Sequence, residues 1–131
     1  MSSSYWLEMA RGAKKTAQVL TEKLNSYNNY MNKLYNLLDR IQSTISIIGN
    51  AKSNYARGGY ICEGETLDKG ALDSCSGVLS RDVEVVNSVM HKTYYDMNDI
   101  QNKINEANNN YQTFINNYYY ALELESQEEM E

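Results

Sequence analysis

The residues of this 131-residue chain that could do chemistry are few and far apart. The single histidine, His91, has no second histidine or cysteine at helical spacing, which favours a surface side chain over a metal ligand or general base. Asp96-Met97-Asn98 begins like a calcium loop, but Gln101 and Ala107 replace the glycine and glutamate that such a loop needs. No nucleophile has a base and an orienting group in sequence. We therefore expect no enzyme, no catalytic residue, no metal and no cofactor.

Glycines and cysteines gather in the middle of the chain. Gly58-Gly59 and the segment 64–70 match neither the dinucleotide-binding nor the phosphate-binding glycine pattern, so no phosphate site is indicated. Cys62 and Cys75 lie thirteen residues apart. They would be free thiols in a cytoplasmic protein and could pair if the protein works outside the cell, so the sequence leaves both states open.

Charge is spread unevenly and limits the classes of partner. Residues 1–50 carry six basic and three acidic groups, whereas residues 51–131 carry six basic and fourteen acidic groups. An acidic chain of this kind repels nucleic acid and anionic membranes. No apolar run of membrane-spanning length occurs, and the first residues lack the apolar stretch of a signal peptide. We expect a cytoplasmic protein with no nucleic acid partner and no membrane insertion, and export without a cleaved signal stays open.

Two long apolar stripes dictate the fold. In each stripe core-type residues recur at alternating steps of three and four, the period of a coiled-coil seam. The first stripe is Trp6, Ala10, Ala13, Ala17, Leu20, Leu24, Tyr27, Met31, Leu34, Leu38, Ile41, Ile45 and Ile48. The second is Leu72, Ser76, Leu79, Val83, Val86, Met90, Thr93, Met97, Ile100, Ile104, Ala107, Tyr111, Phe114, Tyr118 and Ala121.

Breaks in the pattern set the expected boundaries within one domain, 1–131. Gly49-Asn50 is a favourable helix stop, and five acidic residues without a base follow residue 122. We expect a helix over about 4–48, a glycine-rich loop over about 49–70 with a short strand or turn near Tyr60-Ile61-Cys62, and a second helix over about 71–124. A frayed acidic tail, 125–131, would follow. The fold class is all-α, a long antiparallel two-helix hairpin of coiled-coil type.

Apolar residues beside the seam indicate that the hairpin is incomplete. With Ala10 and Leu38 at heptad position a, a set of apolar side chains falls at the flanking e and g positions. This expected partner-binding flank is Leu7, Met9, Tyr30, Tyr35, Leu37, Val89, Tyr94, Ile115 and Leu122. A partner would complete a four-helix bundle, either another helical protein or a second copy in a homodimer. The plainer alternative is that the flanking tyrosines only cover the seam edge.

The layout resembles the small helical partners of bacterial type VII secretion, within the wider WXG superfamily. The segments SSYWLEMARGAKKTAQVLTEKL and GGYICEGETLDKGALDSCSGVL carry this likeness, which is greatest to partners encoded beside LXG-domain toxins in Gram-positive bacteria. The chain departs from the family because no Trp-x-Gly stands at the turn, where Tyr60 is the candidate replacement. The resemblance implies a Tyr-x-x-x-acidic export motif, which Tyr119 and Glu123 match; Tyr35 with Asp39 and Tyr95 with Asp99 match in type only.

The expected function is that of a non-enzymatic targeting partner or chaperone. It would bind the helical N-terminal domain of a type VII-secreted LXG toxin and help present it for export. Two other functions remain open from the sequence: a self-assembling structural coiled coil, and a cytoplasmic secretion chaperone of another system.

Overall fold

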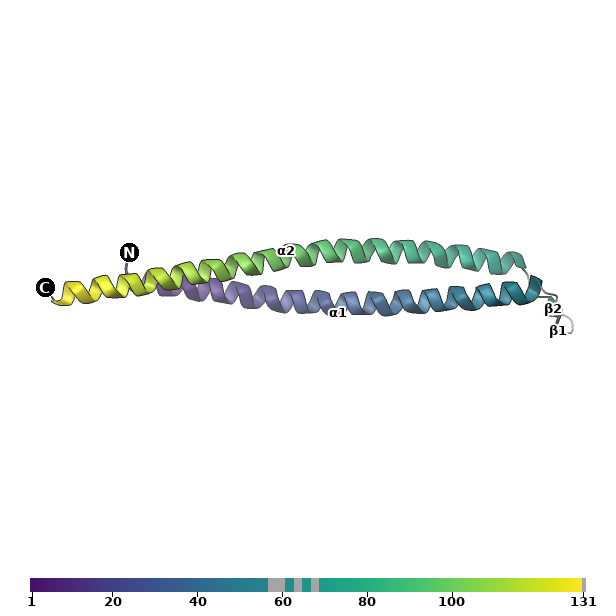
Figure 1. The fold of residues 1–131 in the computed structure, drawn as a ribbon, viewed down its shortest axis with the longest axis horizontal. Coiled ribbons are helices and arrows are strands. Elements are labelled where there is room, and N and C mark those ends of the chain that lie inside the picture. The colour runs from purple at the N-terminus through teal and green to yellow at the C-terminus, as the bar shows by residue number, and fades with distance from the viewer. Residues whose placement is uncertain (57–60, 63–64, 67–68, 131) are drawn as a thin grey trace. The chain divides into compact units, whose positions relative to one another are not determined.

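The computed structural model describes residues 1–56, 61–62, 65–66 and 69–130 of the chain. Helix α1 spans Ser3–Ala56 and helix α2 spans Lys69–Met130. Strands β1 (Ile61–Cys62) and β2 (Glu65–Thr66) pair antiparallel between them, with Ile61 opposite Thr66. The two helices pack against each other, which confirms the all-α hairpin (Figure 1).

The seam follows both sequence stripes without a gap. Every residue of the two stripes is buried or half-buried. Most residues at the other positions of the two helices are exposed. The most buried apolar members are Ala10, Ala17, Met31, Leu34, Val86, Ile100, Ile104, Ala107 and Ala121. Burial at a strict three-four spacing removes the apolar stripe of each helix from water, and this is what holds helices of modest intrinsic propensity together.

The chain divides into two compact units. Unit 1 comprises 1–28 and 94–131, and unit 2 comprises 29–93. In unit 1, the rings of Trp6 and Phe114 stack at a centroid distance of 6.0 Å, and the Lys14 ammonium lies 5.8 Å from the Tyr111 ring centroid. Phe114 also lines a groove with Ala13, so a bulky α2 side chain lies there beside a small residue of α1.

Unit 2 carries the larger aliphatic side chains of α1. Met31, Leu34 and Val86 are buried there. Thr93, the one buried polar side chain of unit 2 among those that the structure describes, donates its hydroxyl to the Val89 carbonyl at 2.7 Å. That hydrogen bond explains why a threonine is tolerated in an apolar stripe, since its polar atom has a partner within its own helix.

The expected end of the first helix is wrong. The helix continues through Gly49-Asn50 to Ala56 instead of ending near residue 48. Glycine within a helix costs only about 1 kcal/mol relative to alanine, and packing beyond it offsets that cost. Ala51 and Lys52 are half-buried, and the Lys52 ammonium pairs with the Asp73 carboxylate at 2.7 Å. The segment between the helices is therefore 57–68 rather than 49–70. Its short strand is confirmed at Ile61–Cys62, and Tyr60 lies outside the described residues.

The expected free acidic tail is also wrong. Helix α2 runs to Met130, well past the predicted end near 124. Glutamate is a good helix former, and Glu125 is fixed by contacts to the start of α1 within unit 1. Residues 125–130 are thus the last part of the second helix.

Candidate partner-binding surface

The antiparallel seam gives the hairpin two distinct sides. Heptad positions in α1 are counted from Ala10 at position a and in α2 from Met90 at position a. Beside the seam, positions g and c lie along one edge of each helix, and positions e and b along the other edge. Because the helices run antiparallel, the g edges of both helices share one side and the e edges share the other. In unit 1 one groove is lined by Met9, Gly12 and Thr16 together with Asn110 and Phe114, which are g, c and seam positions.

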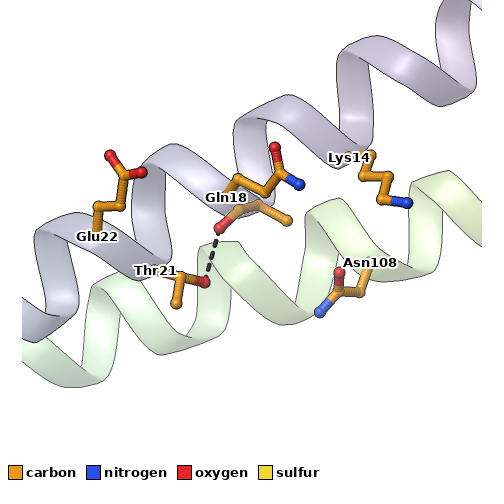
Figure 2. A pocket seen from close by; sticks show the side chains of 6 residues that line it. Lys14, Gln18, Thr21, Glu22 and Asn108 are labelled. Atoms are coloured by element: carbon orange, nitrogen blue, oxygen red, sulfur yellow. Dashed lines mark hydrogen bonds between the residues drawn. The ribbon is translucent and has the colours of Figure 1, made fainter.

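The opposite groove of unit 1 is built from e and b positions. Lys14, Gln18 and Thr21 of α1 and Asn108 of α2 line it together with Ala17 and Glu22 (Figure 2). The Thr21 hydroxyl donates to the Ala17 carbonyl at 2.8 Å, so this side chain is turned back onto its own helix. Apart from Ala17, the side chains that line this groove are charged or polar. Nothing in this groove suggests a reaction.

In unit 2 the g and c side is apolar and open to solvent. Exposed hydrophobic side chains from both helices occupy it, and half-buried Val89 joins them at its inner margin. We call the whole g and c side the apolar side of unit 2, and its large hydrophobic residues are Tyr30, Leu37, Ile47, Val78, Val85 and Val89. Ile47 is 66% exposed and Val85 is 61% exposed, so these side chains contribute little to the seam of the hairpin itself.

The e and b side of unit 2 is polar. Among its described side chains, Tyr35 is the only exposed large hydrophobic one. We call this set the polar side of unit 2: Asn32, Tyr35, Asp39, Gln42 and Ser46 of α1, and Ser80, Glu84, Asn87 and His91 of α2. The two sides of one hairpin therefore present opposite surfaces to solvent.

The predicted partner-binding flank divides between burial and exposure. Met9, Tyr30, Tyr35, Leu37, Tyr94 and Leu122 are exposed, as a free binding surface requires. Leu7, Val89 and Ile115 are half-buried. Prediction from the e and g positions alone missed Ile47, Val78 and Val85, which occupy the outer c position. A search for a second apolar stripe along the c and g positions would have found them.

The residues of the expected export motif lie inside a helix. Tyr119 is 62% exposed and Glu123 is exposed, both within α2 and one helical turn apart. The Tyr118 and Tyr119 rings lie 5.3 Å apart between centroids. The pair was expected near the end of the second helix, but α2 continues for seven residues beyond Glu123. Any receptor would therefore read the tyrosine and the carboxylate from a helical surface.

Glu125, near the end of α2, contacts the first residue of α1. Its carboxylate accepts hydrogen bonds from the Ser3 amide at 2.9 Å and from the Ser3 hydroxyl at 2.8 Å. Ser3 begins α1, whose first amides have no partner within the helix, so Glu125 caps this helix from the other one. The bond from the Ser3 amide is the main reason that the pKa of Glu125 is lowered, and the Ser3 hydroxyl lowers it further.

The remaining chemical candidates stay separate. His91 is exposed in α2, and Cys75 is an exposed free cysteine, while the side chain of Cys62 lies outside the described part of the chain. Within that part, no group of three or more potential metal ligands comes together. No helix among the described residues has an apolar stretch sufficient to cross a membrane. No protein-family model, curated protein or solved structure matches the chain.

Proposed function

We propose that this protein is a non-enzymatic targeting partner that binds the helical N-terminal domain of an LXG-type toxin and helps present it to a type VII secretion system. The identity of the partner rests on the resemblance carried by the segments around residues 3–24 and 58–79. The surface of the hairpin supports a helical partner independently of that resemblance.

The observation that carries the proposal is the apolar side of unit 2. Fully burying an aliphatic side chain contributes about 1.5–3 kcal/mol, and Ile47, Val78 and Val85 leave most of that contribution unused in the isolated hairpin. Exposed hydrophobic side chains that follow a helical period along two adjacent helices fit the apolar face of another helix. A two-helix hairpin thereby becomes half of a four-helix bundle.

The proposed mechanism is helix-on-helix burial followed by recognition. The toxin domain would cover the apolar side, and the assembled bundle would be held in one shape by packing. Tyr119 and Glu123 remain on the surface of α2, where the ring and the carboxylate are both accessible. The export machinery would read this pair on the complex.

The test is co-expression with the product of the neighbouring gene, where that product has a helical N-terminal domain and a toxin-like C-terminal domain. We expect a stoichiometric complex that survives size exclusion, and a protein that unfolds at a higher temperature in the complex than alone. A tight, stable monomer that captures no such helical domain would contradict the proposal. Secretion of the toxin with a Tyr119→Ala or Glu123→Ala variant then tests presentation separately from binding.

A further inference from the structure

We propose that the apolar side of unit 2 binds an amphipathic helix of another protein whose apolar stripe is flanked by acidic residues. This inference deepens the proposed function and rests on it for the identity of the partner. It adds the side of the hairpin that is used and the charge that the bound helix must carry. The surface runs along α1 from Tyr30 to Ile47 and along α2 from Val78 to Val89.

The shape of the surface follows from its heptad positions. Tyr30 and Leu37 lie at g and Ile47 at c on α1, while Val78 and Val85 lie at c and Val89 at g on α2. Both rows flank the same side of the seam, so a helix laid against it would meet apolar side chains from both. Residues at c contribute little to packing within the hairpin, because position c lies outside the a and d seam. Their aliphatic character therefore indicates an external occupant.

Charge distinguishes among the possible occupants. Lys33 and Arg40 lie among Tyr30, Leu37 and Ile47 on the apolar side, and both are exposed. No acidic residue occupies a g or c position anywhere along α1. On α2 the same side of unit 2 carries one acid and one base, Asp82 and Lys92. The apolar side is therefore positively charged on a chain whose net charge is −5.

A second copy of this chain is a poor occupant. Two apolar sides placed face to face would bring like charges together along the interface, which opposes association. The polar side of unit 2 offers a second copy almost no apolar area, since Tyr35 is its one exposed large hydrophobic residue among those described. A different helix with glutamate or aspartate beside its stripe satisfies both the apolar and the charge requirement.

The probe is a pair of synthetic amphipathic helices about four heptads long with the same leucine stripe. One peptide carries glutamate and the other lysine at the flanking positions. Fluorescence anisotropy of each labelled peptide, titrated with the full chain, gives the two dissociation constants. We expect the glutamate peptide to bind about tenfold more tightly at low salt, because each exposed ion pair contributes only modestly. The difference should shrink in about 0.5 M salt.

Variants locate the binding surface. The double variant Ile47→Gln/Val85→Gln should weaken the glutamate peptide about tenfold, since it removes two exposed apolar anchors and leaves the seam intact. Tyr35→Gln, on the polar side of the same unit, is the matched control and should leave the affinity unchanged. Lys33→Glu/Arg40→Glu should reverse the preference so that the lysine peptide binds better. Circular dichroism checks that every variant retains the helical hairpin.

Any of four results would overturn the inference. The two peptides could bind equally well, Tyr35→Gln could weaken binding as much as the double variant, or the chain alone could form a dimer that Ile47→Gln/Val85→Gln converts to a monomer. The last result would assign the surface to a second copy. A toxin domain that binds the wild-type chain and the double variant equally would also overturn it, while leaving the proposed function intact. A toxin domain that does not bind the wild-type chain would contradict the proposed function. The peptide titrations would still test whether the apolar side binds an acidic amphipathic helix.

Discussion

The two sides of unit 2 share one backbone and one seam but differ in what they offer to solvent. The apolar side exposes aliphatic residues such as Ile47 and Val85, with Lys33 and Arg40 among them. The polar side carries amides, hydroxyls, the carboxylates of Asp39 and Glu84, His91 and Tyr35. Both sides border the same buried stripe residues. Packing of the seam therefore does not explain why one side exposes hydrophobic residues and the other does not. The difference supports the proposal that the apolar side binds a partner.

The largest expected effect separates the seam from the apolar side. Leu34 is 8% exposed, so Leu34→Ala should lower the free energy of unfolding by about 2–4 kcal/mol through lost burial and a new cavity. Val85→Ala, on the exposed apolar side, should change it by less than about 0.5 kcal/mol. Urea unfolding followed by circular dichroism measures both. Equal losses would mean that Val85 belongs to the hairpin core and is no free surface.

One glycine on each side of the hairpin allows the effect of an added methyl group to be compared between the two sides. Gly12 lies at a c position and Gly77 at a b position, and a Cβ added at either one meets no atom within 4 Å. Alanine at each should therefore raise the free energy of unfolding by about 0.5–1 kcal/mol through helix propensity alone. Thermal unfolding of the two single variants checks this, and destabilisation by either one would show that its surface is already occupied in the folded chain.

The Ser3–Glu125 contact predicts a pH dependence in unit 1. The pKa of Glu125 is lowered in the folded chain, so its contribution is present above the ordinary carboxyl pKa and is lost as the pH falls through the lowered value. Glu125→Gln should lower the melting temperature at neutral pH and have a smaller effect in acid. Glu128→Gln is the control, because Glu128 is exposed in the same helix. A pH-independent difference between Glu125→Gln and wild type would rule out this role of the carboxylate.

The smallest effect is expected at the ion pair near the connection. Lys52 and Asp73 are partly exposed, and exposed pairs typically contribute at most about 1 kcal/mol. Lys52→Gln should lower the free energy of unfolding by less than about 0.5 kcal/mol at low salt and by less still in high salt. A loss of several kcal/mol would mean that Lys52 holds the end of the hairpin together.

Periodicity predicted the seam well because seam burial depends only on which residues share a helix face. All positions of both stripes are buried or half-buried, including Ser76 and Thr93. The ends were harder, because they depend on contacts distant in sequence. Gly49 signals a stop locally, yet the helix continues to Ala56. Glu125 belongs to a run of charge that predicts fraying, yet Ser3 fixes it from the other helix.

The exposed hydrophobic residues on the apolar side of unit 2 were predicted only in part, for a related reason. The e and g rule identified Tyr30, Leu37 and Val89 but placed Tyr35 with them, although it lies on the other side. The rule also excluded the c positions, where Ile47 and Val85 are exposed. The two sides can be told apart only once the helices are known to run antiparallel. In that arrangement the g positions of both helices lie on one side of the seam and the e positions on the other.

The most direct test of the account is photocrosslinking within the assembled complex. A benzoylphenylalanine side chain would replace Val85 on the apolar side or Tyr35 on the polar side, and each complex with the toxin domain would be irradiated. Both positions are more than half exposed, so the reporter should not disturb the seam. We predict crosslinks to the toxin domain from position 85 and none from position 35. Crosslinks from position 35 alone, or equally from both, would contradict the assignment of the apolar side as the interface.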